Sequence, residues 1–256
     1  MRFLIAGDSH GEFQTLTDVI RNSVNGFGID AVIQVGDFGF FKQYIESIQH
    51  PFQVPVYAID GNHEDHKWLK KQKSFEKLNL FYMKRGTVQE FDGRTVCFVG
   101  GAMNADRKQT GSIQNRTTNY LLNSEADEIV SELNQLDKPI DLMVTHSVPH
   151  SIGVGIQGLP FLIPLVQQYV IDALGVSVGP LNDCGENVLT RLWSKLIHKP
   201  RNWVFGHFHM YHQAVVENCN FWCVGSTDTS DKRMDCVPHI YDTALNEIEA
   251  FPRDTV

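Results

Sequence analysis

The chain has 256 residues, enough for one large domain or two small ones. Hydrophobic residues make up 42% of it and charged residues 20%, which excludes a disordered or low-complexity chain. The 22 Lys and Arg residues are outnumbered by 30 Asp and Glu residues, and the net charge of -8 argues against nonspecific binding of duplex DNA, RNA or an anionic membrane.

The cysteines and the apolar stretches indicate the cellular compartment of the protein. Five cysteines are scattered without a CxxC pair, so neither a disulfide framework nor a zinc–thiolate site is expected. The first apolar run ends at Asp8, too soon for a signal peptide. Residues 159–178 are interrupted by Pro160, Pro164 and Asp172 and do not predict a membrane span. We therefore expect a soluble, cytoplasmic protein that binds no membrane.

In the first third of the chain, short apolar runs end in polar residues. They predict strands at residues 3–5, 31–35 and 54–59. Between the first two strands, residues 13–24 have the apolar spacing of an amphipathic helix. A strand, a helix and another strand form the repeating unit of a parallel sheet with buried strands.

The middle of the chain has a different pattern. Residues 87–99 alternate around Asp92-Gly93 and predict a β-hairpin. A helix is expected from Ser124, which would cap it, to Leu136, and a buried strand at residues 140–144.

The last third begins with an irregular segment. Residues 147–186 are rich in Gly, Pro and apolar side chains, and we expect them to form an insertion that lies over the site as a cap or lid. The alternative is a structural element packed on the outside. After this insertion the pattern predicts a helix at 187–197 that Pro200 stops, strands at 203–205, 214–216 and 221–224, and further β structure from His239. The whole chain is expected to be a single domain, residues 1–256.

Polar residues follow five of the predicted strands directly, and in an open α/β sheet ligand sites form at that edge. Eight of them can hold a metal or move a proton: Asp8, His10, Asp37, Asn62, His63, His146, His207 and His209. Oxygen and imidazole ligands without thiolates suit a divalent ion such as Mn, Fe, Co, Ni or Zn. The spacing of Asp8 and His10, and that of His207 and His209, lets both members of each pair point to one side.

Five short motifs, read in order, resemble those of the calcineurin-like metallophosphoesterase superfamily. They are D8-x-H10, G36-D37, G61-N62-H63-E64, H146 and G206-H207-x-H209. The resemblance spans residues 8–209. It implies a four-layer α/β/β/α sandwich of two mixed β-sheets flanked by helices, with a two-metal site at the sheet edge.

The resemblance also implies a role for each residue. Seven side chains would hold two divalent ions: Asp8, His10 and His209 the first, Asn62, His146 and His207 the second, with Asp37 bridging both. Manganese is the leading choice, with Fe, Zn, Ni, Co and Mg as alternatives. Asp37 and the acid His63 would be the catalytic residues, because an imidazole can donate a proton near neutral pH. Asn62 would also touch the substrate. Arg107 would reach the substrate phosphate, and the alternative is a surface or salt-bridged arginine.

The sequence lacks several residues of the superfamily's Ser/Thr protein phosphatases, which makes that activity less expected. Its Ser/Thr protein phosphatases carry an Arg before Gly-Asn-His and an Asp-Arg pair after Gly-Asp, where this chain has Asp60 and Phe38-Gly39-Phe40. We therefore expect a phosphoesterase that hydrolyses a phosphomonoester or a small phosphodiester by attack of a metal-bridging hydroxide. A nuclease or cyclic-nucleotide phosphodiesterase is the alternative within enzymes, and a non-catalytic protein-interaction scaffold is the alternative of another class. A small phosphorylated substrate, rather than duplex nucleic acid, is the expected partner.

Overall fold

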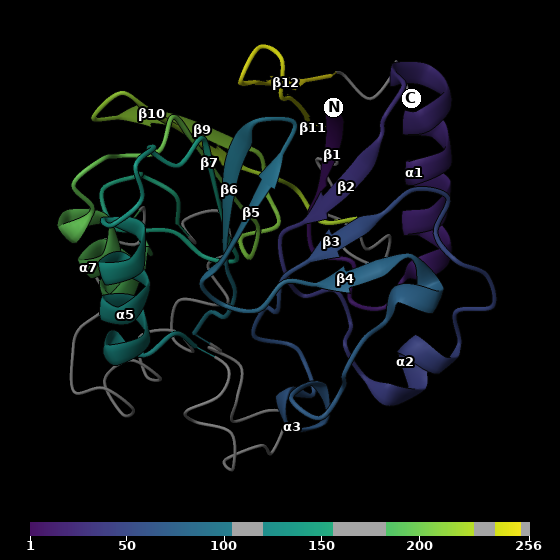
Figure 1. The fold of residues 1–256 in the computed structure, drawn as a ribbon. Helices are drawn as coiled ribbons and strands as arrows, with labels where there is room; N and C mark the ends of the chain where they lie inside the picture. The colour runs from purple at the N-terminus through teal and green to yellow at the C-terminus, as the bar shows by residue number, and fades with distance from the viewer. Residues whose placement is uncertain (104–119, 156–182, 228–238, 252–256) are drawn as a thin grey trace.

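A computed structural model of the protein describes residues 1–103, 120–155, 183–227 and 239–251. Two six-stranded mixed sheets face each other, and helices cover their outer faces (Figure 1). This confirms the four-layer sandwich that the sequence resemblance implies.

Parallel pairing dominates the centre of the first sheet, where β1 to β4 run side by side, and β11 and β12 continue it in antiparallel fashion. In spatial order its strands are β12 (Glu247–Ala250), β11 (His239–Asp242), β1 (Arg2–Ala6), β2 (Ala31–Gln34), β3 (Val56–Ala58) and β4 (Leu80–Tyr82). The register places Ile5 of β1 opposite His239 of β11.

The second sheet has four parallel central strands between two antiparallel edge strands. In spatial order its strands are β5 (Thr87–Phe91), β6 (Arg94–Val99), β7 (Leu142–Thr145), β8 (Asn202–Phe205), β10 (Cys219–Cys223) and β9 (His212–Val216). The hairpin predicted around Asp92-Gly93 is confirmed as β5 and β6.

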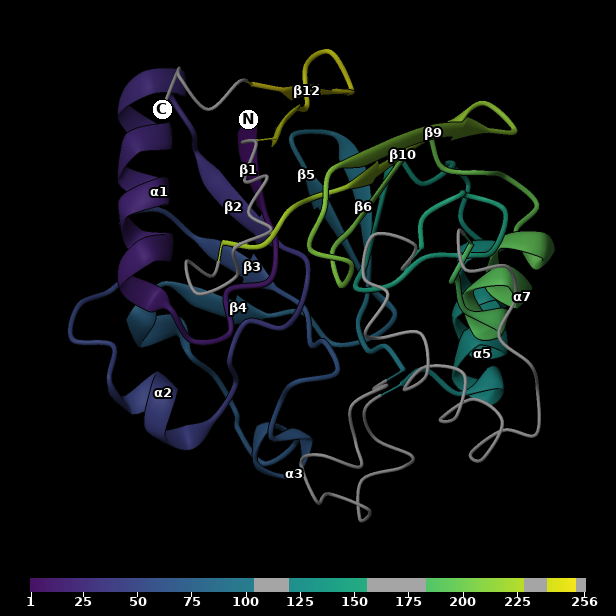
Figure 2. The same ribbon diagram turned by 180° about the vertical axis from the view of Figure 1, so that it is seen from behind.

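Helices lie on the two outer faces and at the lower end of the molecule in the view of Figure 2. They are α1 (Phe13–Phe27), α2 (Lys42–Glu46), α3 (His66–Leu69), the short 3-10 helix η1 (Glu76–Leu78), α5 (Asn123–Leu133) and α7 (Asn187–Lys195). Helix α1 covers the first sheet, and α5 and α7 pack together on the second (Figures 1 and 2).

Alternating side chains along the strands create three apolar layers. In β1, Phe3 faces the second sheet, whereas Leu4 packs against the helices outside the first sheet. In β8, Val204 faces the first sheet, while Trp203 and Phe205 pack under α5 and α7. Because successive side chains of a strand point to opposite faces, both faces of both sheets are buried.

The predicted boundaries of helices α5 and α7 were wrong. Helix α5 starts at Asn123, and the carboxylate of Glu125, not Ser124, accepts the free N–H of Leu122 at 2.8 Å. It ends at Leu133, three residues earlier than the apolar spacing indicates. Helix α7 ends at Lys195, because Leu196 already has an extended backbone well before Pro200. None of the described helices has the length and apolar composition to cross a bilayer.

Candidate metal centre

Two clusters of potential metal ligands meet where the carboxyl ends of strands from both sheets come together. Asp8 follows β1, Asp37 follows β2 and Asn62 follows β3 in the first sheet. His146 and His207 follow β7 and β8 in the second sheet. Each side chain thus leaves its strand where the backbone ladder stops, and the two sheets supply ligands from opposite sides.

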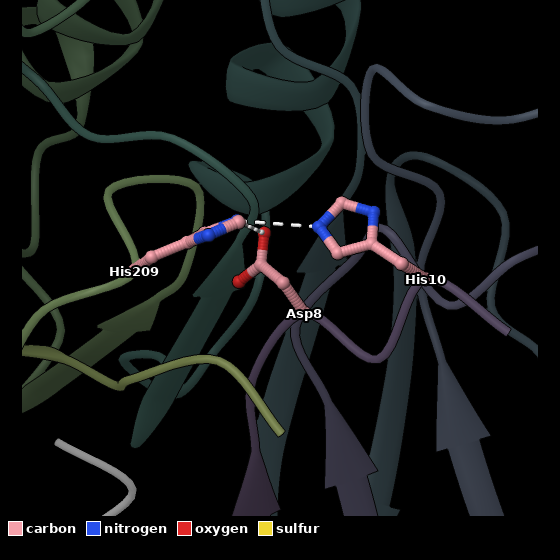
Figure 3. A group of neighbouring side chains, drawn as sticks. All are labelled: Asp8, His10 and His209. Atoms are coloured by element: carbon pink, nitrogen blue, oxygen red, sulfur yellow. Dashed lines mark hydrogen bonds and ion pairs between the residues drawn. The ribbon is translucent and has the colours of Figure 1, made fainter. Parts of the chain in front are cut away.

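The first cluster consists of Asp8, His10 and His209 (Figure 3). Nε2 of His10 lies 3.2 Å from Nε2 of His209, and the latter lies 3.4 Å from Oδ1 of Asp8. The two imidazoles and the carboxylate point toward one another, as three ligands of a single ion would.

The second cluster consists of Asp8, Asp37 and His146, so Asp8 belongs to both. Nε2 of His146 lies 3.3 Å from Oδ2 of Asp37, 3.7 Å from Oδ1 of Asp8 and 3.1 Å from Oδ1 of Asn62. On the other side of the ring, Nδ1 lies 2.8 Å from the carbonyl oxygen of Val35. A proton on Nδ1 donated to that carbonyl fixes the ring and directs Nε2 at the carboxylates.

His207 and His63 lie beside these clusters. The ring of His207 packs edge-on against that of His146, with centroids 5.1 Å apart, and its backbone N–H donates to both carboxylate oxygens of Asp8 at 3.1 Å. The ring of His63 lies 5.6 Å from that of His10, and its backbone N–H donates to Oδ1 of Asp37 at 2.7 Å. The structure thus brings together the eight residues that the sequence motifs single out, and their individual roles stay predictions.

Four of these residues have a left-handed backbone, which non-glycine residues rarely adopt. The φ angles are 48° at His10, 49° at Asp37, 68° at His207 and 52° at His209. Such a conformation costs on the order of 1–3 kcal/mol and persists only where the surroundings impose it. All four residues lie in the loops that follow β1, β2 and β8.

Two motif glycines leave room for a ligand that comes from another strand. A Cβ on Gly61 would lie 2.1 Å from Oδ1 of Asp37 and 2.4 Å from its backbone nitrogen. A Cβ on Gly206 would lie 2.4 Å from Oδ2 of Asp8. These glycines are needed because the carboxylates pack directly on the backbone of the next motif.

Burial and the mutual attraction of ligands decide their charges. Burial alone would raise the pKa of Asp8, but His209 and His146 lower it to about 2. Burial likewise opposes ionisation of Asp37, yet His146 and His63 hold the pKa of that carboxyl well below its usual value. Both carboxylates are therefore ionised at neutral pH.

The pKa values of the two buried imidazoles, His146 and His207, shift in opposite directions. Burial lowers the pKa of His146, but Asp37 and Asp8 outweigh it and raise the pKa to about 10. For His207, burial and the repulsion of His146 together lower the pKa to about 3. A protonated His146 thus neutralises part of the carboxylate charge, while His207 is neutral.

Side chains outside the predicted set hold the ligand loops in place. The buried carboxylate of Glu64 accepts the backbone N–H groups of Phe38, Gly39 and Phe40, which follow Asp37. Burial raises the pKa of Glu64, and the nearby Asp37 raises it further. The sequence places Glu64 in a motif but does not reveal this function, because its partners are backbone atoms of a distant loop.

A second support lies under the loop of Asn62 and His63. The buried carboxylate of Asp60 accepts hydrogen bonds from Arg85 at 2.7 and 3.1 Å and from the hydroxyl of Tyr82 at 3.1 Å. Burial would raise the pKa of Asp60, but Arg85 lowers it. The residue that replaces the phosphatase arginine is therefore an anchor for the Gly61-Asn62-His63 turn.

The donor set fits divalent cations. Within each cluster the ligand atoms all lie within 4.8 Å of one another, and they are carboxylate oxygens and imidazole nitrogens without sulfur. A cation between them can replace the proton of His146, because Nε2 and the oxygens that face it are all metal ligands.

Two predictions concern residues outside the described part of the chain. Arg107 lies there, and so do residues 156–182 of the predicted cap. The two described ends of the insertion lie side by side, because the backbone N–H of Cys184 donates to Val154 at 2.8 Å and that of Glu186 to Val148 at 2.8 Å. The role of the insertion as a lid stays a prediction.

The chain belongs to the calcineurin-like phosphoesterase family, whose model matches residues 1–211. This places it among phosphoesterase hydrolases and confirms the sequence resemblance.

Two curated relatives are lariat debranching enzymes. The one from Arabidopsis thaliana is 23% identical over 98% of this chain and 64% of its own length. The one from Schizosaccharomyces pombe is 25% identical over 81% of this chain and 43% of its own length. The chain therefore spans about two thirds or less of the curated relatives it matches.

Solved structures share the fold at low sequence identity. A protein of Thermus thermophilus superposes with a TM-score of 0.64 at 14% identity, covering 98% of each chain. A dimetal phosphatase from Danio rerio superposes with a TM-score of 0.53 at 11% identity, covering 94% of this chain and 91% of its own. At these identities the likeness concerns the fold alone.

Proposed function

We propose that the protein is a two-metal phosphoesterase that hydrolyses a phosphodiester at the edge shared by its two sheets. The observation that carries this proposal is the pair of clusters joined at Asp8, with the His63 ring directly beside them. Storing a metal would require the ligands alone, whereas His63 adds a proton donor that touches the cluster edge.

Different residues of the chain would bind the two metal ions and donate the proton. Asp8, His10 and His209 would hold one ion, Asn62, His146 and His207 the other, and Asp37 would face both. Two divalent ions, when bound, clamp a phosphoryl group and generate a nucleophile from water near neutral pH. His63 would donate a proton to the leaving oxygen, because its backbone is anchored on Asp37 while its ring lies half-buried at the edge of the clusters. Manganese is the ion that we propose first.

The choice of a diester over a monoester rests on two arguments. The names of the curated relatives, lariat debranching enzymes, favour a nucleic-acid diester. A phosphomonoester carries one more negative charge, and Asp60 stands where the protein phosphatases place a cationic arginine. The cytoplasm remains the proposed location.

A substrate panel tests the proposal. The protein reconstituted with Mn²⁺ is assayed against p-nitrophenyl phosphate, bis(p-nitrophenyl) phosphate and a cyclic nucleotide, with the chelated protein as a control. We expect hydrolysis of the bis ester to exceed that of the monoester and to disappear on chelation. Activity that persists without metal would contradict the two-metal assignment, and metal binding without any hydrolysis would favour a scaffold.

A further inference from the structure

A group of lysines follows His63 at the end of the molecule where the metal centre lies. Residues 67–77 contain five of the 22 Lys and Arg residues and a single acid, Glu76. The first four lysines are all exposed, and none of them belongs to the ion pairs formed among the described residues: Lys67, Lys70, Lys71 and Lys73. A chain with a net charge of -8 thus concentrates unneutralised positive charge at one place.

Hydrogen bonds fix this segment next to the metal-ligand loops. The carboxylate of Asp65 accepts the N–H of Trp68 at 2.9 Å and so caps α3. The backbone N–H of Asp65 donates to the carbonyl of Phe40 at 3.2 Å, which ties α3 to the loop after Asp37. Lys67 stands four residues beyond His63, a span of at most ~14 Å of extended chain.

An exposed aromatic ring packs on the loop that follows β1. Tyr44 of α2 is 41% exposed, and its ring packs on Gly11, directly after His10. The ring of Phe41 supports it edge-on, with centroids 5.4 Å apart. Helices α2 and α3 both lie at the end of the molecule toward which β1 runs from the N-terminus (Figure 1). A flat, supported ring beside a phosphate-binding centre can stack on a nucleobase.

The lysines and the aromatic ring together indicate which class of ligand this surface would bind. Lysines that track phosphates, next to an aromatic ring that stacks on bases, are the usual means of binding single strands. A duplex hides the base faces in its own stack, and α3 with four residues is too short to read a groove. The overall acidity of the chain also opposes nonspecific duplex binding.

We propose that Lys67, Lys70, Lys71 and Lys73 bind the backbone of a single-stranded nucleic acid, and that Tyr44 stacks on a base next to the phosphodiester at the metal centre. This inference names the substrate class of the proposed function and rests on it. The net charge of the chain does not reveal this basic surface, because it sums the lysines with acidic residues on other faces.

A charge-matched pair of variants tests the lysines. The first carries Lys67→Gln, Lys70→Gln and Lys71→Gln. The control carries Arg21→Gln, Lys138→Gln and Arg201→Gln, which removes three exposed charges from other faces. Binding of dye-labelled dT12 and U12 to the chelated protein is measured by fluorescence anisotropy between 50 and 300 mM salt. Hydrolysis of bis(p-nitrophenyl) phosphate is measured with the metal-loaded protein.

The lysine variant is expected to bind both oligonucleotides about a hundredfold more weakly at ~0.1 M salt. Its log–log salt slope should be smaller by about 2, since each lost phosphate contact removes ~0.7. The control variant and the wild type should agree within twofold, and all three should hydrolyse the small ester equally. Equal binding by the two variants, or binding of a dT12·dA12 duplex as tight as that of dT12, would overturn the proposal.

Tyr44 is tested separately. Tyr44→Leu should weaken dT12 binding about fivefold or more, because stacking contributes ~1–3 kcal/mol per base, whereas Tyr44→Phe should keep it. An abasic dodecamer should not distinguish the two variants, and if it does, Tyr44 does not stack on a base. If the metal-loaded wild type does not hydrolyse bis(p-nitrophenyl) phosphate, the proposed function is refuted but the binding surface is not. Metal-dependent hydrolysis with lysine-independent binding would refute the surface alone.

Discussion

Replacing Gly61 by alanine tests whether close packing of the motifs positions the metal ligands. The new Cβ would lie 2.1 Å from Oδ1 of Asp37, and ordinary contact begins at 3.4 Å, so the carboxylate must move by about 1.3 Å. Rotation of the side chain cannot relieve the clash, because the backbone nitrogen of Asp37 is only 2.4 Å away. A misplacement of about 1 Å at a reacting centre can lower the rate about 100-fold.

The matched control is Gly26→Ala. Nothing lies within 4 Å of a Cβ at Gly26, which is inside α1, so alanine should stabilise the helix by about 0.5–1 kcal/mol. Metal content after dialysis, kcat/KM for bis(p-nitrophenyl) phosphate and Tm are measured for both variants. We expect Gly61→Ala to lose metal and about 100-fold of kcat/KM and Gly26→Ala to retain both with a slightly higher Tm. Wild-type activity in Gly61→Ala would refute the reasoning.

Three further predictions concern the ligands and the acid. Asp37→Asn should reduce tight metal binding from two ions toward none, since Asp37 would face both ions, and mass spectrometry of the native protein counts the ions; retention of two ions would contradict the shared role. His63→Ala should keep both metals but slow hydrolysis by about 10²–10⁴-fold, most for poor leaving groups; equal slowing of nitrophenyl and alkyl esters would count against an acid. Metal affinity should fall as the pH falls, because the pKa of His146 is about 10 in the metal-free protein and a cation must displace its proton. Each pH unit below that value should lower the apparent affinity about tenfold for one released proton, and calorimetry in two buffers of different ionisation enthalpy measures the proton; affinity independent of pH would show that His146 is not a ligand.

The strands and their polar ends could be predicted from the sequence because two strong signals coincide. A continuous apolar run marks a strand that is buried on both faces, and the polar residues after it mark the edge of the sheet. This is why the sequence predicts that the polar residues from Asp8 to His209 lie together. The short elements were missed: α2, α3, η1 and β4 have three to five residues, too few for a period to show.

The supports of the site could not be predicted from the sequence for a different reason. Glu64 binds backbone N–H groups of a loop that precedes it by many residues, and such partners leave no side-chain pattern. Asp60 and Arg85 form an ion pair between segments that follow two neighbouring strands. The residues around either one in the sequence therefore do not indicate its partner. The capping error at Ser124 has a local origin, because Glu125 accepts the free N–H of Leu122 at the same helix terminus.

The pairing of β1 with β11 has a consequence for the order in which the protein can be assembled on a ribosome. Both neighbours of β1 are needed to cover its edges, and one of them, β11, follows all the strands from β2 to β10 along the chain. The strand that leads to Asp8 therefore has one open edge until β11 has been synthesised, and open strand edges invite pairing with other chains. The ligand cluster that begins at Asp8 should therefore settle only after residues 239–242 have emerged.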